Sequence, residues 1–185
     1  MRAAHKPARF CREQLIMPIF KGDGFVPDDW RHLPQGEDLP ASGKFILTLA
    51  QWQAIRARGQ SGGGAYFGLL VEPGQDLRPV VPDLPRFALI AVAFPKFTDG
   101  RGYSLARRLR NHYAFAGELR ATGDILFDQL QLLARCGFDS FEIKDETTIR
   151  LLESGRRPGF EIFYQPGIGP EAPERTRPWA RRASP

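Results

Sequence analysis

The segment at residues 95–102 (PKFTDGRG) combines two cations, an acid and two glycines within eight residues. It follows an apolar run and precedes an amphipathic pattern, so we expect it to join a strand to a helix. A helix N-terminus offers unpaired N–H groups, and an arginine adds a planar fork for a carboxylate, phosphate or sulfur oxyanion. Glycine allows positive φ and close approach of the backbone. We therefore predict an anion site formed by Lys96, Asp99, Gly100, Arg101 and Gly102.

The same segment also has a purely structural interpretation. Asp99 and Gly100 form a residue pair that favours a tight turn. In that case the Asp99 carboxylate pairs with Arg101 and holds the loop in shape. The sequence leaves both interpretations open.

A second group of candidates surrounds the segment Gly123-Asp124. Asp124 and Asp128 are four residues apart, so they share one face near the start of a predicted helix. Paired carboxylates can bind a cation or exchange protons, but Asp124 can equally be the N-cap of that helix. We include Gly123, Asp124 and Asp128 as candidate ligand-binding residues.

Arg120 is the remaining candidate, because it lies in a strand that we expect to be covered on both faces. A buried arginine needs an acidic partner. Glu118, Asp99 or Asp124 can supply one. A structural ion pair is one interpretation, and the other is that Arg120 and Asp124 frame the anion pocket.

These residues need a scaffold, and the hydrophobic pattern predicts one. The run at 87–94 (FALIAVAF) is apolar on both faces, as in a covered parallel strand. Leu105, Leu109 and Tyr113 have helical spacing, and Thr48 and Gln51 have the spacing of a capping box. Strands are predicted at 44–47, 66–71, 87–94, 117–122, 138–144 and 160–164, with helices after 48, from 104, from 124 to a stop at Gly137, and at 146–153.

Alternating strands and helices predict a single α/β domain. We expect a mostly parallel open sheet of about five to six strands with helical crossovers, and ligands outside the carboxyl ends of the strands. The expected organisation is an irregular N-terminal arm at 1–43, the α/β domain at 44–166, and a disordered basic tail at 167–185.

Composition narrows the function classes. The net charge is +5, but residues 1–12 carry four cations and no acid, and residues 171–185 add a further excess, so 13–170 is nearly neutral. This argues against a nucleic-acid groove. Two cysteines and three histidines without ligand spacing argue against a metal site. We expect a cytoplasmic protein without a membrane segment, and neither a Rossmann nor a P-loop motif indicates a cofactor.

Residues 94–143 resemble a known family, the bacterial domain of unknown function 934 family. The shared features are Phe-Pro-x-Phe, Asp-Gly-Arg-Gly-Tyr-Ser, Gly-Glu-Leu-Arg-Ala-x-Gly-Asp and Arg-Cys-Gly-Phe-Asp-x-Phe, in this order and spacing. Weaker similarity extends over about residues 44–166. The resemblance implies a link to assimilatory sulfate and sulfite reduction, because family members are often encoded beside sulfite reductase. It implies no catalytic residues.

Three hypotheses follow for the function. The leading one is an accessory factor or oxidoreductase of sulfite reduction with an anion site at the DGRG segment and an unidentified cofactor. The alternative is a non-catalytic protein partner of sulfite reductase or of its electron donor. The third is an enzyme of acid/base chemistry, which requires Asp99 or Asp124 to be buried with a raised pKa.

Overall fold

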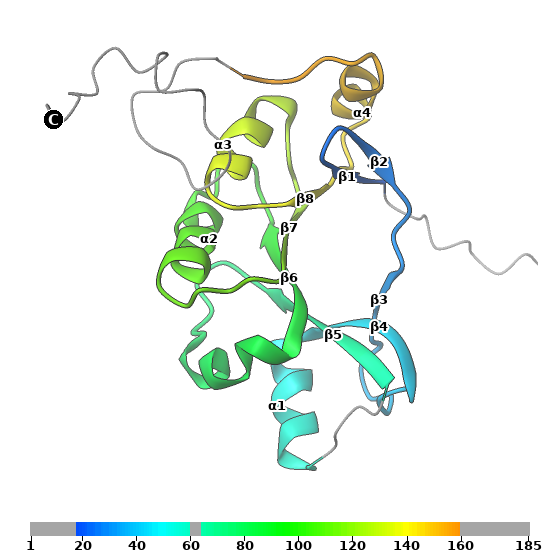
Figure 1. Cartoon of the computed structure of the whole chain (residues 1–185), viewed down its shortest axis with the longest axis vertical. Helices are drawn as coiled ribbons and strands as arrows, with labels where there is room; N and C mark the ends of the chain where they lie inside the picture. Colours follow the sequence, from blue (N-terminus) through cyan, green and yellow to red (C-terminus); the bar gives the residue numbers. More distant parts are fainter. Residues whose placement is uncertain (1–17, 60–63, 160–185) are drawn as a thin grey trace, which may run out of the picture.

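A computed structural model describes residues 18–59 and 64–159, which form one mixed eight-stranded sheet with helices packed against it (Figure 1). The strands are β1 (Ile19–Lys21), β2 (Gly24–Val26), β3 (Trp30–His32), β4 (Ser42–Thr48), β5 (Gly64–Val71), β6 (Phe87–Phe94), β7 (Glu118–Gly123) and β8 (Ser140–Glu142). The helices are α1 (Leu49–Ala57), α2 (Arg101–Asn111), α3 (Leu130–Arg135) and α4 (Glu146–Glu153), with 3-10 helices η1 (Arg78–Arg86) and η2 (Phe127–Gln129).

The strand order is β2-β1-β8-β7-β6-β5-β4-β3. Strands β3 to β8 are parallel and adjacent in chain order, whereas β1 is antiparallel to both β8 and β2. The expectation of five to six mostly parallel strands is therefore wrong in number and in type. Three strands come from residues 19–32, for which the sequence predicts only an irregular arm, because segments of three residues are too short to show a period.

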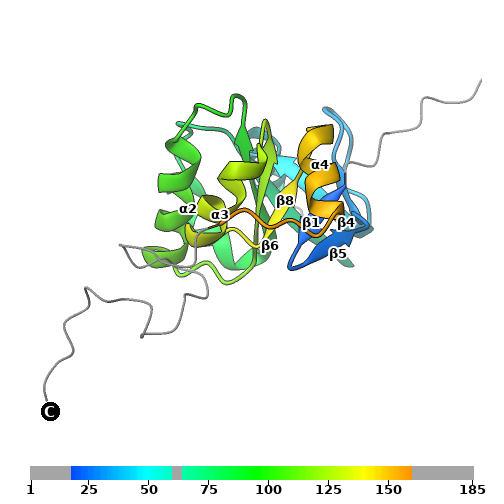
Figure 2. The same ribbon diagram turned by 90° about the horizontal axis from the view of Figure 1, so that it is seen from above.

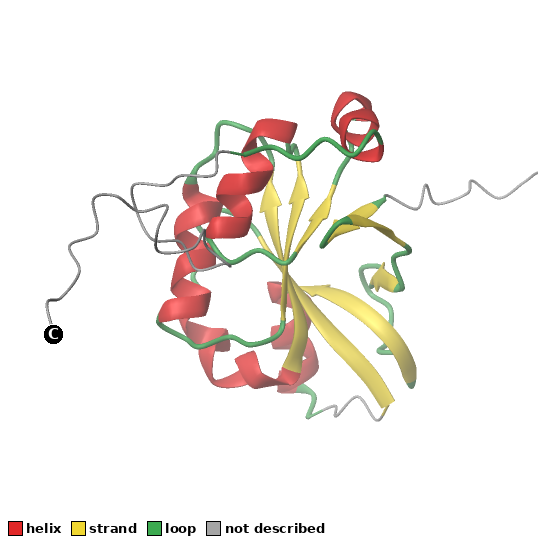
Figure 3. Cartoon of the chain, turned by 45° about the horizontal axis from the view of Figure 1, so that its top comes forward, coloured by secondary structure: helices red, strands yellow, loops and turns green. Residues whose placement is uncertain are grey.

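Every crossover from β3 to β8 advances in the same direction, so these strands contain no topological switch point. The sheet curls into a half-barrel, and α1, α2 and α3 lie together on its convex side (Figures 2 and 3). An open sheet binds ligands in the crevice of a switch point. Strands β3 to β8 thus lack the crevice that a switch point opens, and the ligand site expected outside their carboxyl ends stays a prediction.

The convex face of the sheet is the apolar one. Alternate strand residues pack beneath the helices in one core, among them Leu47, Leu69, Val92, Leu119 and Ile143. Trp52 of α1 is buried in this core, and its indole Nε1 donates to the buried Asp83 of η1 at 3.0 Å. The core holds the carboxyl ends of the strands at one edge.

The concave face combines a small apolar cluster with charged residues. Ile46, Leu89 and Ala91 pack together with Trp30 and Leu70 on this face. The strap, which we define as residues 27–29, joins β2 to β3 and so runs between strands at opposite edges of the sheet (Figure 1). It passes over the concave face rather than around it.

Local signals fix several helix ends as the sequence predicts, but α2 begins at Arg101 rather than at residue 104. Thr48 and Gln51 form the capping box of α1, and Gly137 follows the end of α3 with φ +101°. Asp124 is not an N-cap, because two residues separate it from η2 and its carboxylate is used elsewhere. The strand predicted at 160–164 and the tail at 167–185 lie outside the described residues.

Candidate functional site

The DGRG segment lies between β6 and α2, as expected, and the chain itself occupies its anion position. The Asp99 carboxylate accepts hydrogen bonds from Arg101 Nε at 2.9 Å, from Arg101 Nη2 at 2.7 Å and from the Arg101 backbone N–H at 3.1 Å. These bonds, with the side-chain bond as the largest cause, lower the pKa of Asp99 from 3.8 to about 2. A carboxylate of the loop therefore stands where the sequence predicted a bound oxyanion.

Neither glycine of this segment forms a left-handed turn, and only Gly102 serves packing. Gly100 has φ −74°, and a Cβ built on it meets nothing within 4 Å. A Cβ on Gly102 would lie 2.4 Å from the ring of Phe94, so the first turn of α2 packs directly on that buried ring. The expected positive φ at Gly100 and Gly102 is thus wrong, while the expected close approach is found at Gly102.

The loops after β6 and β7 converge through the backbone of Phe97. Its N–H donates to Asp124 Oδ2 at 3.0 Å, and its carbonyl accepts from Gln129 Nε2 at 2.8 Å. Gly123 allows the contact, because its φ of +111° turns the chain where a Cβ would lie 2.4 Å from the Phe94 carbonyl oxygen. Asp124 and Gln129 therefore clamp Phe97 from two sides.

The clamped loop presents its side chains to solvent. The Phe97 side chain is 50% exposed although both of its backbone polar groups are bonded. Lys96 beside it is exposed, and its side chain makes no hydrogen bond or ion pair with residues 18–59 or 64–159. An ordered loop thus carries an uncovered aromatic ring next to a cation.

The expected pairing of Asp124 with Asp128 does not occur. Asp124 bonds to the Phe97 backbone, and Asp128 is exposed in η2. Within the described parts of the chain, no group of three or more histidine, cysteine or acidic residues is placed to hold a metal ion. Asp124 is exposed, and the pKa of Asp99 is lowered rather than raised, so the acid/base hypothesis lacks the feature that it requires.

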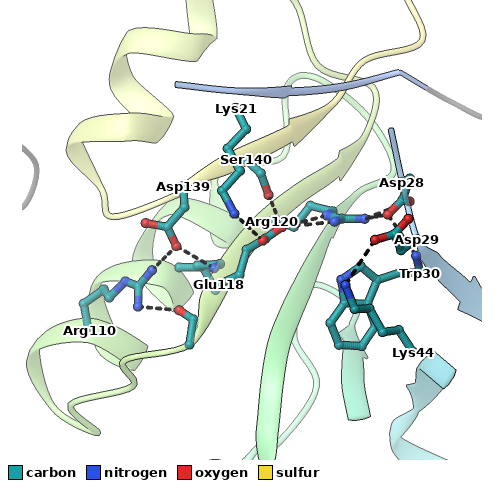
Figure 4. A network of polar contacts seen from close by, with 12 residues as sticks. Lys21, Asp28, Asp29, Trp30, Lys44, Arg110, Glu118, Arg120, Asp139 and Ser140 are labelled. Carbon is teal, nitrogen blue, oxygen red and sulfur yellow. Dashed lines mark hydrogen bonds and ion pairs between the residues drawn. The ribbon is translucent and has the colours of Figure 1, made fainter. Parts of the chain in front are cut away.

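Arg120 lies apart from the DGRG segment, on the concave face in the middle of β7. Its side chain is 4% exposed, and Nη1 donates to both carboxylate oxygens of Asp28 at 2.9 and 3.0 Å. Nη2 donates to Glu118 at 3.0 Å (Figure 4). Of the three expected partners only Glu118 is found, and Arg120 does not frame a pocket with Asp124.

Glu118, like Arg120, bonds several residues of a polar network on the concave face. It accepts from Lys21 Nζ at 2.6 Å and from the Ser140 hydroxyl at 2.7 Å, and it also bonds Arg120. Burial raises its pKa, but the bonds from Lys21 and Ser140 and the charge of Arg120 more than offset this effect, so the pKa lies below its usual value. Glu118 is thus a fixed, ionised acceptor rather than a proton donor.

A cavity of about 120 Å³ borders the network beneath the strap. Its lining includes Lys21, Asp28, Asp29, Trp30, Lys44, Glu118 and Arg120. Lys44 bonds Asp29 at 3.2 Å, so the cavity's charged groups are largely satisfied by one another (Figure 4). The network fixes the strap on the sheet.

Sequence reasoning missed Asp28, Lys21 and Ser140 as parts of this network. Asp28 is 92 residues from Arg120, in a segment without a hydrophobic period. The available signal was the buried arginine itself, which requires acidic partners. That Asp28 is the second acidic partner of Arg120 is evident only from the path of the strap over the sheet.

The architecture described above is that of a mixed α/β protein with a consecutively wound, curled sheet. The family model described as "Bacterial protein of unknown function (DUF934)" matches residues 68–174, which is more than half of the chain. The chain belongs to this family. The matched range includes the clamped loop and β7, but it does not include the strap.

A comparison with curated proteins gives no match. Among the described residues, no helix is both long and apolar enough to cross a membrane. These findings leave the function to be argued from the site.

Proposed function

We propose that this protein is a non-catalytic accessory protein of assimilatory sulfite reduction that docks on a protein partner through the loop at 95–101. The pathway rests on the sequence resemblance, whose family members are often encoded beside sulfite reductase. The observation that carries the docking role is the clamp on Phe97. The partner is sulfite reductase or its electron donor.

The clamp supports docking for an energetic reason. Ordering a loop on binding costs conformational entropy, and a loop already fixed by Asp124 and Gln129 avoids much of that cost. Exposed aromatic residues on fixed backbones are typical centres of protein interfaces. Lys96 adjoins Phe97 in the chain and Arg101 ends the same loop, so the surface suits a partner with acidic residues around an apolar pocket.

The candidate anion-binding groups and the cysteine give less support to an oxidoreductase than the clamped loop gives to docking. Arg101 is engaged by Asp99, and Arg120 and Glu118 belong to the closed network beneath the strap. Cys136 is buried, and burial raises the pKa of its thiol, which disfavours the reactive thiolate. We therefore propose an accessory role rather than an anion-binding oxidoreductase.

The test is a calorimetric titration of the purified protein against purified sulfite reductase and, separately, against its electron donor. Phe97→Ala should weaken binding to the true partner by about 30-fold, as expected for an aromatic hot spot of about 2 kcal/mol. Tyr66→Ala is the matched control, because Tyr66 is also an exposed aromatic residue, at 61%, but lies in β5.

The control should bind like the unaltered protein. The proposal is wrong if neither protein binds at micromolar concentrations, or if the two substitutions weaken binding equally. Phe97 is half exposed and its backbone bonds do not depend on the ring, so a folding defect is not expected; circular dichroism melting checks this.

A further inference from the structure

A second surface, separate from the Phe97 loop, lies between α2 and the segment that follows β5. It is a groove of about 720 Å³ lined by Gly74, Gln75, Asp76, Leu77, Arg78, Arg108, His112 and Tyr113. The segment at 74–78 forms one wall, and the exposed side of the C-terminal half of α2 forms the other. None of the predicted site residues is among these lining residues, but one of them, Arg101, lies against Gly74 at the end of the groove.

The α2 wall carries a row of cationic and donor groups. Arg101, Arg108 and His112 are seven and four residues apart, so at 100° per residue they fall in one stripe along the helix. All three are exposed, while the opposite side of α2 buries Gly102, Ala106 and Leu109. Arg108 and His112 of this stripe line the groove, and the stripe continues along α2 to Arg101.

Arg101 lies at one end of this groove, where its one guanidinium nitrogen that does not bond Asp99 contacts the groove wall. Asp99 binds Nε and Nη2, whereas Nη1 lies against Gly74, where a built Cβ would stand 3.0 Å from it. Gly74 has φ +86°, a backbone conformation that favours glycine. The groove thus begins at Arg101 and ends at His112.

Arg78 places a cation on the facing wall. Asp76 accepts from its Nε at 3.0 Å and its Nη2 at 2.9 Å, which orients the guanidinium and leaves Nη1 for another acceptor. This ion pair lowers the pKa of Asp76 and raises that of Arg78, and the side-chain hydrogen bond is the largest cause in both. The Arg108 side chain forms no hydrogen bond or ion pair with any described residue, although its carbonyl accepts from the N–H groups of His112 and Tyr113.

Arg110 lies on the same helix as the arginines of the groove but has a structural role. Arg110 donates to the carbonyls of Phe115, Gly117 and Gly137, so its guanidinium ties α2 to the neighbouring loops. Arg108 lacks such bonds and faces the groove instead. Its charge is available for a partner outside this chain.

We propose that this groove binds an acidic segment of a protein partner in an extended conformation. Arg101 to His112 spans about 16 Å at 1.5 Å per residue, the length of about five extended residues at 3.3 Å each. Small-molecule sites are enclosed and mainly apolar, whereas this groove is lined chiefly by charged and polar groups. Cations on both walls match carboxylates spaced along a chain.

The inference deepens the proposed function, on which it rests for the existence of a partner. Lys96 and Phe97 lie in the loop that leads into α2, so an acidic segment in the groove would continue from the docking loop. The Phe97 loop would supply the apolar contact and the groove the charge recognition. The two surfaces can be tested separately.

The test uses fluorescein-labelled hexaglutamate, with hexaglutamine as the control peptide, and measures fluorescence anisotropy at about 50 mM and about 300 mM salt. Hexaglutamate should bind at low salt and be released at high salt, and hexaglutamine should not bind. Arg108→Glu should weaken binding about tenfold, because it removes the central cation and adds a repelling charge.

Arg107→Glu is the matched control, because Arg107 is an exposed neighbour on the same helix that does not line the groove. It changes the net charge equally and should change the affinity less than about twofold. Equal weakening by both substitutions would show diffuse attraction and overturn the inference. Absence of hexaglutamate binding at low salt, or its displacement by equimolar inorganic phosphate, would overturn it as well.

Titration of the partner protein separates the two claims. If Phe97→Ala weakens partner binding but Arg108→Glu does not, the groove inference fails and the proposed function stands. If neither does, the proposed function fails.

Discussion

Arg120 and Asp28 are 92 residues apart in the sequence, yet Arg120 Nη1 lies 2.9 Å from an Asp28 carboxylate oxygen on the concave face of the sheet. Arg120 comes from the middle of β7 and Asp28 from the strap between β2 and β3. The pair thus fixes a segment that connects opposite edges of the half-barrel. Glu118 binds the other side of the same guanidinium and completes the site.

Asp28→Ala should lower the free energy of unfolding by about 3 kcal/mol, because it leaves the Arg120 charge buried with one partner fewer. Urea denaturation followed by circular dichroism measures this change. Asp29→Ala is the control, since the Asp29–Lys44 pair is exposed, with side-chain exposures of 70% and 42%. It should cost less than about 1 kcal/mol. Equal losses would mean that Arg120 does not anchor the strap.

Glu118 should make the stability depend on pH on the acidic side. Its pKa in the folded protein lies below the usual 4.5, so its contribution is present above 4.5 and is lost as the pH falls through the folded value. Glu118→Gln should therefore be less stable than the unaltered protein at neutral pH. The difference should narrow toward about pH 3, measured by urea midpoints across the range. A gap that is independent of pH would contradict the ionised state of Glu118.

The two glycines of the DGRG segment should respond differently to alanine. Gly102→Ala should cost about 2 kcal/mol, because its Cβ would overlap the Phe94 ring, which is packed against Tyr103 and Phe138. Gly100→Ala should change stability by less than about 0.5 kcal/mol, since that position is open and has negative φ. Thermal melting compares the two. A large loss at Gly100 alone would favour the anion-loop interpretation instead.

Removal of the Asp99 carboxylate should create an anion site. In Asp99→Ala, Arg101 and its backbone N–H lose their internal acceptor at the start of α2, where an anion is favoured. Sulfate or sulfite at about 10 mM should then raise the melting temperature of the variant but not that of the unaltered protein. Sodium chloride at equal ionic strength is the control. An equal rise in both proteins would mean that Asp99 does not block the site.

The sequence predicts those elements best in which local signals and long-range packing agree. The buried run of β6, the capping box at Thr48 and the helix at 146–153 carry a full period or a cap, and all three are found. The strands at 19–32 were missed because three residues show no period and their pairing partners are distant or antiparallel. Their existence depends on tertiary contact rather than on local preference.

The contacts of the candidate site likewise include some that the sequence predicts and others that it does not. Residue types and spacing singled out the Asp99–Arg101 pair as one of two interpretations. They identified Asp124 as a ligand-binding residue or a helix cap, whereas its carboxylate accepts from the Phe97 N–H. The clamp on Phe97 was not predictable, because it joins a backbone group to side chains 27 and 32 residues away. Such contacts become visible only when the two loops are placed side by side at the sheet edge.

Hydrogen exchange followed by mass spectrometry, with and without the partner, tests the central claim most directly. The Phe97 N–H is bonded to Asp124, so residues 95–101 report both the clamp and any covering protein. In the presence of saturating sulfite reductase or its electron donor, exchange over 95–101 should slow several-fold, while β5 should be unchanged. Unchanged exchange at 95–101 with both proteins present would contradict docking through this loop.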